Sequence, residues 1–314
     1  MNGQSLPARV WLALWNNPVL LLTLTTLTWA GHSVVGRMAV DQISPMTLTC
    51  GRWLLAVAPI AFAARRTLRR DLEILRAHWL YVLAMGALGF TGFNALFYIA
   101  THRTTALNLS IIQGIVPAVV LVFARLAYGA RIGALQALGT VATMIGVVAI
   151  AAQGDWAKLA SFAFNSGDLL ILLACLIYAG YTTGLRSRPR VSGLGFLAML
   201  AFVALVTSAP LLGIEIASVG FIWPTMKGYL ALAYAAFVAS FVSQLLFMRG
   251  VQLIGPGRAG VFVNLVPLFG ALMAVGLLGE PFATYHAVAL CLVVGGIALA
   301  QAGPRLPPSR AKYD

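Results

Sequence analysis

The chain has 314 residues, of which 61% are hydrophobic and 9% are charged. Soluble domains carry roughly 25% charged residues, so this composition excludes a soluble globular fold, which could not bury so much apolar surface. The formal net charge of +13 would suggest a nucleic-acid partner in a soluble protein. In a membrane protein, the basic residues instead indicate which side of the bilayer each loop faces. We therefore expect the lipid bilayer as the surroundings and no nucleic-acid partner.

The apolar residues fall in blocks of about 20, the length that an α-helix needs to cross a bilayer at 1.5 Å per residue. Charge clusters and Pro/Gly turns divide the chain into such blocks, and the short connections make neighbouring helices antiparallel. The sequence thus predicts an all-α membrane protein with ten transmembrane helices. The expected spans are residues 17–40, 43–63, 78–100, 104–126 and 133–152, then 166–185, 193–214, 228–249, 257–278 and 284–302.

The positions of the 21 basic residues predict the orientation of the chain. With the N-terminus in the cytoplasm, most of them fall in cytoplasmic loops, as the positive-inside rule requires. The exceptions are Arg37, Arg52, Arg103, Lys158 and Lys227. An even number of spans puts both termini in the cytoplasm. We expect a multi-pass protein of a bacterial cell inner membrane.

The chain also contains an internal repeat with a period near 150 residues. The predicted halves are residues 1–155 and 165–314, and each carries five spans, so the second half must be inverted relative to the first. Inverted repeats are common in secondary transporters, where the substrate site lies near mid-membrane between the repeats. A shift of 150 superposes Phe97 on Phe247, Pro117 on Pro267 and Gly129 on Gly279, and a shift of 149 superposes Gly31 on Gly180.

Polar and aromatic side chains inside the spans predict an interior cavity, because lipid offers them no hydrogen-bond partner. For any single residue, the alternative is a hydrogen bond that only joins neighbouring helices. Prolines at equivalent points of spans four and nine are expected to kink these helices, as hinges or as packing kinks. The residues expected to bind substrate are Trp29, His32, Asn94, Tyr98, Gln113, Tyr181, Gln244 and Asn264, with Pro117 and Pro267 as hinges.

Two ionisable residues are expected in the interior of the spans, away from the span ends. Arg52 can contact a substrate carboxylate or bond a backbone carbonyl near a helix end, and His32 can carry protons or stay neutral and hydrogen-bonded. Proton-driven and sodium-driven carriers usually keep a carboxylate at mid-span. Here the carboxylates fall in loops or at helix ends, which favours a facilitative carrier or weak coupling through His32. They include Asp41, Asp155, Asp168, Glu215 and Glu280.

Motifs for catalysis and cofactor binding are missing from the sequence. No HExxH, GxSxG or Walker sequence occurs, and the GxGxxG match at residues 255–260 follows no predicted strand. The three cysteines lie in apolar segments without a partner at ligand spacing. We therefore expect no cofactor, no metal and no enzymatic activity.

Several short motifs also match a known family of transporters. They are WAG at 29–31, GR at 36–37, SP at 44–45, RW at 52–53, GDLL at 167–170, VP at 266–267 and LGEP at 278–281. On these motifs the chain resembles the EamA-type proteins of the drug/metabolite transporter superfamily. The resemblance implies ten helices in two repeats, both termini in the cytoplasm, and export of amino acids, related metabolites or toxic compounds through a central cavity. Two positions depart from the family pattern, since Ala130 replaces the first-half glutamate and His32 stands where many members carry asparagine.

Together these features predict a secondary, ATP-independent transporter that exports small metabolites, amino acids or related amphipathic compounds, by alternating access through a central cavity. One alternative is a sugar-nucleotide or organophosphate antiporter of the same superfamily, which would need several basic residues around a phosphate. A membrane-embedded enzyme or a non-transporting membrane partner is the alternative of a different class, and neither would need paired features in both halves. The sequence leaves the oligomeric state open.

Overall fold

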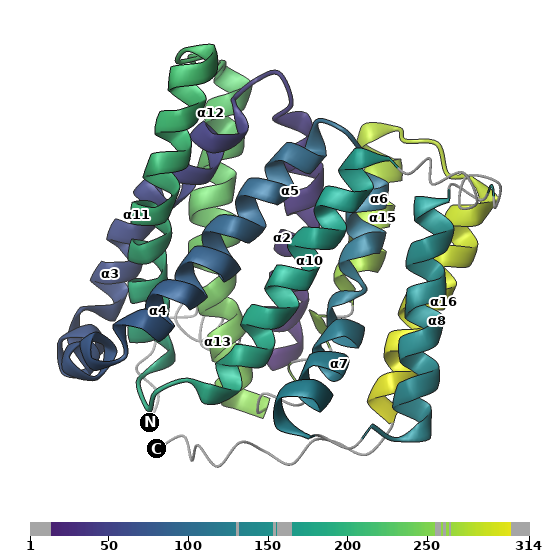
Figure 1. The fold of residues 1–314 in the computed structure, drawn as a ribbon, viewed down its shortest axis with the longest axis horizontal. Coiled ribbons are helices and arrows are strands. Elements are labelled where there is room, and N and C mark those ends of the chain that lie inside the picture. The colour runs from purple at the N-terminus through teal and green to yellow at the C-terminus, as the bar shows by residue number, and fades with distance from the viewer. Residues whose placement is uncertain are drawn as a thin grey trace, which may run out of the picture.

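The computed structural model describes residues 14–129, 132–152, 155, 165–254, 259, 262–263 and 265–302. Within these residues every regular element is helical (Figure 1). The first half contains α2 (Pro18–Met38), α3 (Pro45–Ala77), α4 (Trp79–Gly86), the π-helix η1 (Ala87–Gly92), α5 (Phe93–Thr101), α6 (Ala106–Gln113), α7 (Val116–Tyr128) and α8 (Ala134–Ala151). The second half contains α10 (Ser166–Gly184), the short 3₁₀-helix η2 (Leu185–Ser187), α11 (Gly193–Val219), α12 (Met226–Ala233), the π-helix η3 (Tyr234–Val242), α13 (Ser243–Ile254), α15 (Leu265–Leu278) and α16 (Thr284–Ala302).

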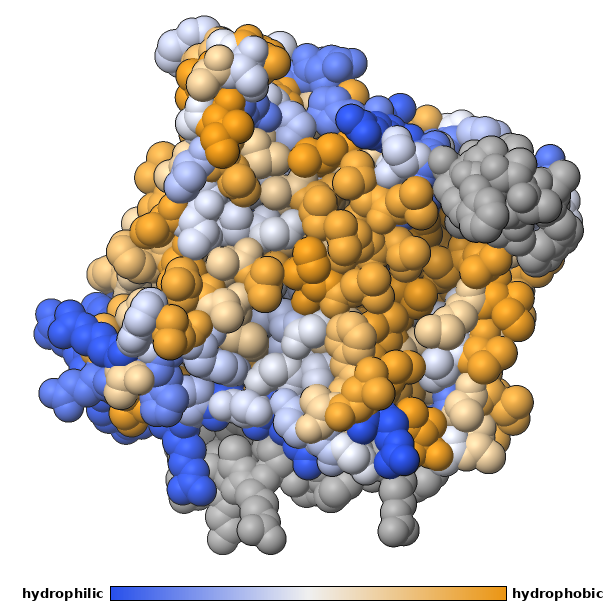
Figure 2. Space-filling view, in the orientation of Figure 1, coloured by the Kyte–Doolittle hydropathy of each residue, from blue (hydrophilic) through white to orange (hydrophobic). Residues whose placement is uncertain are grey.

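These elements form ten membrane-spanning segments in two inverted five-helix repeats, as predicted. Seven segments of the described chain are long and apolar enough to cross a bilayer, and the apolar helices α8, α15 and α16 are shorter. Figure 2 shows apolar residues across the middle of one face and hydrophilic residues gathered at its upper and lower ends. Large side chains such as Leu126, Leu138, Phe202 and Leu272 are exposed. Surfaces of this kind are stable only against lipid.

Polar residues fix where several helices begin. The side-chain oxygens of Asn17, Thr105 and Ser192 each accept a backbone N–H from the first turn of α2, α6 and α11, which satisfies a donor that the helix itself leaves free. Gly129 and Gly279, paired by the sequence repeat, end α7 and α15 with φ of 64° and 66°. This left-handed conformation suits glycine.

Several predicted spans differ from the structure, since α11 ends at Val219 and α13 at Ile254, beyond the expected ends at residues 214 and 249. Span two was expected to end near residue 63, but α3 continues to Ala77. Its last turns carry the arginines that the sequence pattern assigns to a loop, because charged residues are good helix formers once the helix leaves the bilayer. Span four is divided between Gln113 and Val116 into α6 and α7, next to Pro117, where the sequence predicts a kink.

The two repeats are interleaved (Figure 1). The α2 helix packs against α13 and α15, and its counterpart in the second repeat, α10, packs against α5, α6 and α7. The α3 helix pairs with α11, and α8 pairs with α16. Exchanging the five spans of one repeat for those of the other leaves this set of contacts unchanged, as an inverted duplication requires. Since the halves share their packing, neither is a separate body, and the boundaries at residues 155 and 165 stay a prediction.

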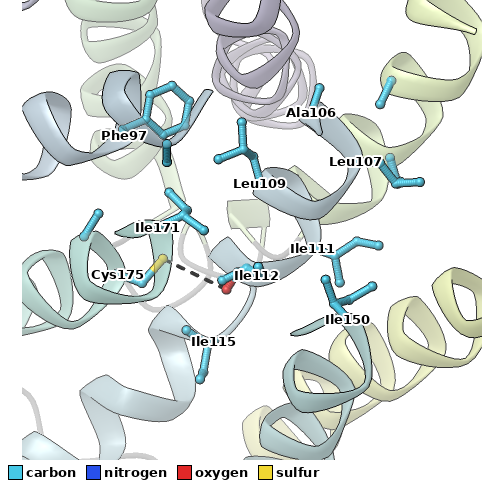
Figure 3. Packing of buried hydrophobic residues seen from close by; sticks show 14 of the residues in the cluster. Phe97, Ala106, Leu107, Leu109, Ile111, Ile112, Ile115, Ile150, Ile171 and Cys175 are labelled. Carbon is cyan, nitrogen blue, oxygen red and sulfur yellow. Dashed lines mark hydrogen bonds between the residues drawn. The ribbon is translucent and has the colours of Figure 1, made fainter. Parts of the chain in front are cut away.

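Charge divides the molecule into two ends. The end at which α2 begins and α16 ends carries ten described arginines, namely Arg65, Arg66, Arg69, Arg70, Arg76, Arg125, Arg186, Arg188, Arg190 and Arg249, and we call it the basic end. The opposite end carries Asp41, Asp155, Asp168, Glu215 and Glu280, and we call it the acidic end. The bundle between them is tightly packed. Figure 3 shows Phe97, Ile112, Ile150 and Ile171, which come from four different spans and are buried together.

Glycines bring the α8–α16 pair into backbone contact. A Cβ atom added at Gly296 would lie 2.6 Å from the carbonyl oxygen of Gly139 and 2.9 Å from the backbone nitrogen of Thr143. In lipid, helices associate largely through such close van der Waals packing. The neighbouring Gly295 faces open space.

This contrast gives a stability prediction. Gly296→Ala is expected to lower the free energy of unfolding by about 1–3 kcal/mol, because backbone atoms must move apart. Gly295→Ala is expected to leave it unchanged or raise it by up to about 1 kcal/mol, since alanine is the better helix former. Thermal unfolding of both purified variants in one detergent checks this. Equal melting temperatures would contradict the packing described for α8 and α16.

Candidate functional site

A cavity of about 190 Å³ lies where the two repeats meet. Nine of the ten spans contribute lining residues, among them α2, α3, α10 and α15. On several spans the lining residues lie at mid-span or nearer the basic end, as Trp29, Val116 and Gln244 do. The next turns toward the acidic end, with Tyr98 and Leu109, are buried. The cavity therefore extends from the middle of the bundle toward the basic end.

Arg52 is the charged group of this cavity. It lies about two turns from the start of α3 and is 8% exposed. Its Nε donates to Ser240 Oγ at 2.6 Å, and its Nη1 donates to Asn94 Oδ1 and to the Tyr98 hydroxyl. These acceptors come from η3 and α5, so one side chain joins spans of both repeats. Among the described residues, no carboxylate forms an ion pair with Arg52.

His32 completes the polar cluster around Arg52. Its Nε2 lies 3.1 Å from Arg52 Nη1. Because a guanidinium N–H can only donate, Nε2 must accept, and the ring proton of the neutral imidazole is therefore on Nδ1. A protonated ring would turn two donors toward each other. The contact thus fits a neutral, hydrogen-bonded histidine better than a proton carrier.

Aromatic rings form one wall of the cavity. Trp53 stacks on Phe90 with 4.8 Å between ring centroids, and Phe93 lies 4.9 Å from Tyr178. On α2, Trp29 also lines the cavity, and its indole N–H donates to Ser243 Oγ at 3.0 Å. Flat rings around one cation suit a small amphipathic solute.

Interruptions in the helices surround the cavity. The break between α6 and α7 places Gly114 and Pro117 on the cavity, and Pro267 near the start of α15 lines it as well. A Cβ added at Gly114 would lie 3.2 Å from Pro267 Cγ, so the break packs against the second proline. The π-helices η1 and η3 occupy equivalent positions in spans three and eight. Irregular backbone inside a membrane is tolerated where it borders protein or a cavity.

The structure brings most of the sequence-predicted site residues together. Trp29, His32, Arg52, Asn94, Gln113, Pro117, Gln244 and Pro267 line the cavity. Tyr98 lies behind the lining, where its hydroxyl accepts from Arg52. Tyr181 also lies behind it and packs on Phe90 and Tyr178. Asn264 lies outside the described residues. Their roles in substrate binding and as hinges stay predictions.

Sequence reasoning missed other lining residues, among them Trp53, Phe90, Phe93 and Ser240. Ser240 is an ordinary residue in an apolar run, and only the wider π-helical turn of η3 directs it to Arg52. The aromatic residues had a usable signal, since Trp53 follows Arg52 and Phe90 and Phe93 lie within one turn of Asn94.

Ten spans in inverted repeats around a cavity of polar and aromatic residues define the class of membrane carriers with duplicated halves. Comparison with known proteins gives the family. The model of the EamA-like transporter family matches residues 16–152 and 165–301. The chain therefore belongs to the EamA-like transporter family.

Several relatives share nearly the whole length. The uncharacterized transporter YyaM of Bacillus subtilis is 25% identical over 304 residues, covering 94% of this chain and 96% of that protein. The uncharacterized inner membrane transporter YedA of Escherichia coli is 24% identical and 90% of each chain is covered. The protein PA1977 of Pseudomonas aeruginosa is 30% identical, covering 92% and 95%. A protein crystal structure with 20% identity superposes with a TM-score of 0.62 over 90% of this chain and 96% of the other, which supports the fold.

The anchoring of Arg52 gives a second prediction. Tyr98→Phe keeps the ring contacts with His32 and Phe97 and removes only the hydroxyl acceptor. We expect a loss of about 0.5–1.5 kcal/mol in the free energy of unfolding. Tyr229→Phe, on an exposed ring, is the matched control and should change nothing. If the two variants unfold at the same temperature, the hydroxyl of Tyr98 does not support Arg52.

Proposed function

We propose that the protein is a secondary transporter that exports small metabolites, amino acids or related amphipathic carboxylates, by alternating access through the cavity around Arg52. The observation that carries this proposal is the buried guanidinium facing a cavity between inverted repeats. A cation there costs free energy unless a partner approaches, and a carboxylate can pair with a guanidinium through two parallel charge-assisted hydrogen bonds. The relatives named as transporters support the same class of function.

Orientation follows from the charges. In this proposal the basic end faces the cytoplasm of a bacterial inner membrane, as the positive-inside rule favours, and both termini lie there. The cavity then extends toward the cytoplasm, where a substrate for export would enter. One guanidinium favours a carboxylate over a sugar nucleotide or an organophosphate, since phosphate groups carry more charge and are usually bound by several basic residues.

Counterflow in liposomes tests this function. Liposomes that contain the purified protein and an unlabelled solute are expected to accumulate the labelled form of that solute from outside without a pH gradient. This should hold for at least one member of a panel of amino acids and related carboxylates. The physical reason is the acceptor role of His32 Nε2 toward Arg52, which leaves no free proton carrier in the described cluster. Arg52→Gln should abolish the exchange.

Two outcomes would contradict this proposal. Exchange that requires a pH gradient and disappears in His32→Ala would replace the facilitative mechanism by proton coupling. A wild-type protein that exchanges no solute across broad panels would contradict transport itself.

Carboxylates that cap helix starts support alternating access. At the acidic end, Glu280 accepts the backbone N–H groups of Ala106 and Leu107 at 2.9 and 2.8 Å, and so joins α15 to α6. At the basic end, Asp71 of α3 accepts from the backbone and hydroxyl of Ser192 at the start of α11, and so holds the α3–α11 pair together. Opening of the acidic end while the basic end closes requires the Glu280 contact to break.

Weakening one of these contacts should open that end. Glu280→Gln keeps one acceptor oxygen and loses the charge, which should weaken the contact by about 1–2 kcal/mol. A cysteine introduced by Gln244→Cys reports opening through its reaction with a membrane-impermeant maleimide added on the acidic side. We expect this labelling to be roughly 3-fold to 30-fold faster when Glu280→Gln is present. The background has the three native cysteines replaced by alanine. Glu73→Gln makes the same substitution at an exposed carboxylate of the basic end and should leave the rate unchanged. Equal rates in both variants would show that Glu280 does not hold the acidic end closed.

A further inference from the structure

The charge of the cavity has no counter-charge in the described protein. All the hydrogen-bond acceptors of Arg52 are neutral, and they belong to Ser240, His32, Asn94 and Tyr98. The described carboxylates of Asp41, Asp71, Glu73, Asp155, Asp168, Glu215 and Glu280 all lie near the ends of the bundle. A lone cation in an apolar interior is unfavourable, so the site as a whole is one negative charge short.

Several hydrogen-bond donors beside the cavity have no acceptor among the described residues. In the part of the chain that the structure describes, Trp53 Nε1 and His32 Nδ1 are buried without a hydrogen-bond partner. Trp53 is 3% exposed and lies beside the guanidinium, whose central carbon is 5.1 Å from the indole ring. Of the nitrogens of Arg52, Nη2 donates to no described residue. Unpaired buried donors are costly, and an acceptor-rich ligand would satisfy them.

The rest of the lining is apolar and flat. Trp29, Trp53, Phe90, Phe93 and Tyr178 present five rings to the cavity. The polar groups beyond the arginine cluster include the amides of Gln113 and Gln244, which carry no net charge. The site thus combines one cation, spare donors and aromatic walls.

We propose that the cavity binds aromatic monocarboxylates that lack an ammonium group in preference to the amino acids of the same skeleton, and carries them across the membrane as anions. This proposal rests on the function proposed above and narrows its substrate class. A monoanion brings the charge of the occupied site to zero. A zwitterion leaves Arg52 uncompensated, because its ammonium cancels its carboxylate and finds no anionic partner among the described lining residues.

Charge movement gives the direction of transport. A carrier that moves a monoanion without a coupling ion moves one negative charge per cycle. The bacterial membrane potential is negative inside, so it drives such an anion outward. Export then needs no proton gradient, which agrees with the absence of a carboxylate among the described lining residues.

Binding to the purified wild-type protein is the first test. The ligands are 3-phenylpropanoate, phenylalanine and 2-phenylethylamine, which share one ring and differ in their charged groups, and quenching of tryptophan fluorescence reports occupancy because Trp29 and Trp53 line the cavity. We expect 3-phenylpropanoate to bind roughly tenfold or more tightly than phenylalanine, and the amine to bind most weakly. Phenylalanine binding as tightly as 3-phenylpropanoate would overturn the proposal.

An isosteric variant tests the charge argument through a ratio of two dissociation constants, which does not depend on how much folded protein is obtained. Gln244→Glu adds a carboxylate to the cavity lining at nearly constant shape, so the ratio of the two dissociation constants should fall toward one or reverse. Gln252→Glu makes the same change on the same helix, at an exposed residue, and should leave the ratio as in the wild type. A ratio that Gln244→Glu does not change would also overturn the proposal.

Flux under an imposed potential tests movement as an anion. In liposomes with valinomycin and a roughly tenfold K⁺ gradient, inside positive, 3-phenylpropanoate should accumulate up to roughly tenfold above its level in protein-free liposomes. Accumulation that ignores the potential would overturn the anionic mechanism. If other solutes exchange but 3-phenylpropanoate neither binds nor moves, this inference fails and the proposed function stands. If it binds as expected but no solute crosses, the transport function fails.

Discussion

Burial of the Arg52 guanidinium is the constraint around which the interior of the bundle is arranged. An arginine on an isolated membrane helix would extend its side chain to the interface or meet water. Here neutral oxygens and a ring nitrogen reach it from α2, α5 and η3. Satisfying its donors therefore requires spans of both repeats to meet at one point. The cavity is the space beside that point, and its unbalanced charge is a property of the fold.

Interleaving of the repeats determines how such a site can move. The pairs α3–α11 and α8–α16 each join equivalent spans of the two halves, and the second pair is locked by backbone contact at Gly139 and Gly296. The irregular segments lie elsewhere, at the α6–α7 break and in η1 and η3, and they border the cavity. Rigid pairs with interruptions at the centre place the deformable backbone beside the ligand. The geometry thus separates the elements that keep the bundle together from those able to rearrange.

Hydropathy and charge were enough to predict the ten spans, because each helix that crosses the bilayer needs one bilayer thickness of apolar residues. The inverted repeat followed from residues that superpose at a shift near 150 and from the odd number of spans in each half. The polar residues that line the cavity could be selected for a similar reason, since His32, Asn94 and Gln113 have no satisfactory place against lipid. The sequence does not show which face of each helix points toward the cavity. Tyr98 and Tyr181, which lie behind the lining, were therefore predicted to be part of it. The π-helical turns could not be read either, because a widened turn has no residue signature, and Ser240 was missed with them.

The two ends of the bundle are similar in topology but not in chemistry. Gly129 and Gly279 make the same left-handed turn, yet the residue that follows is Ala130 in one repeat and Glu280 in the other. Glu280 caps the start of α6 with two charge-assisted hydrogen bonds, whereas an alanine side chain has no acceptor with which to cap anything. A cap of this kind contributes about 0.5–2 kcal/mol. Exchanging the conformations of the two repeats would forfeit that contribution, so the two access states differ in energy, and the state with the acidic end closed is the one that this sequence favours.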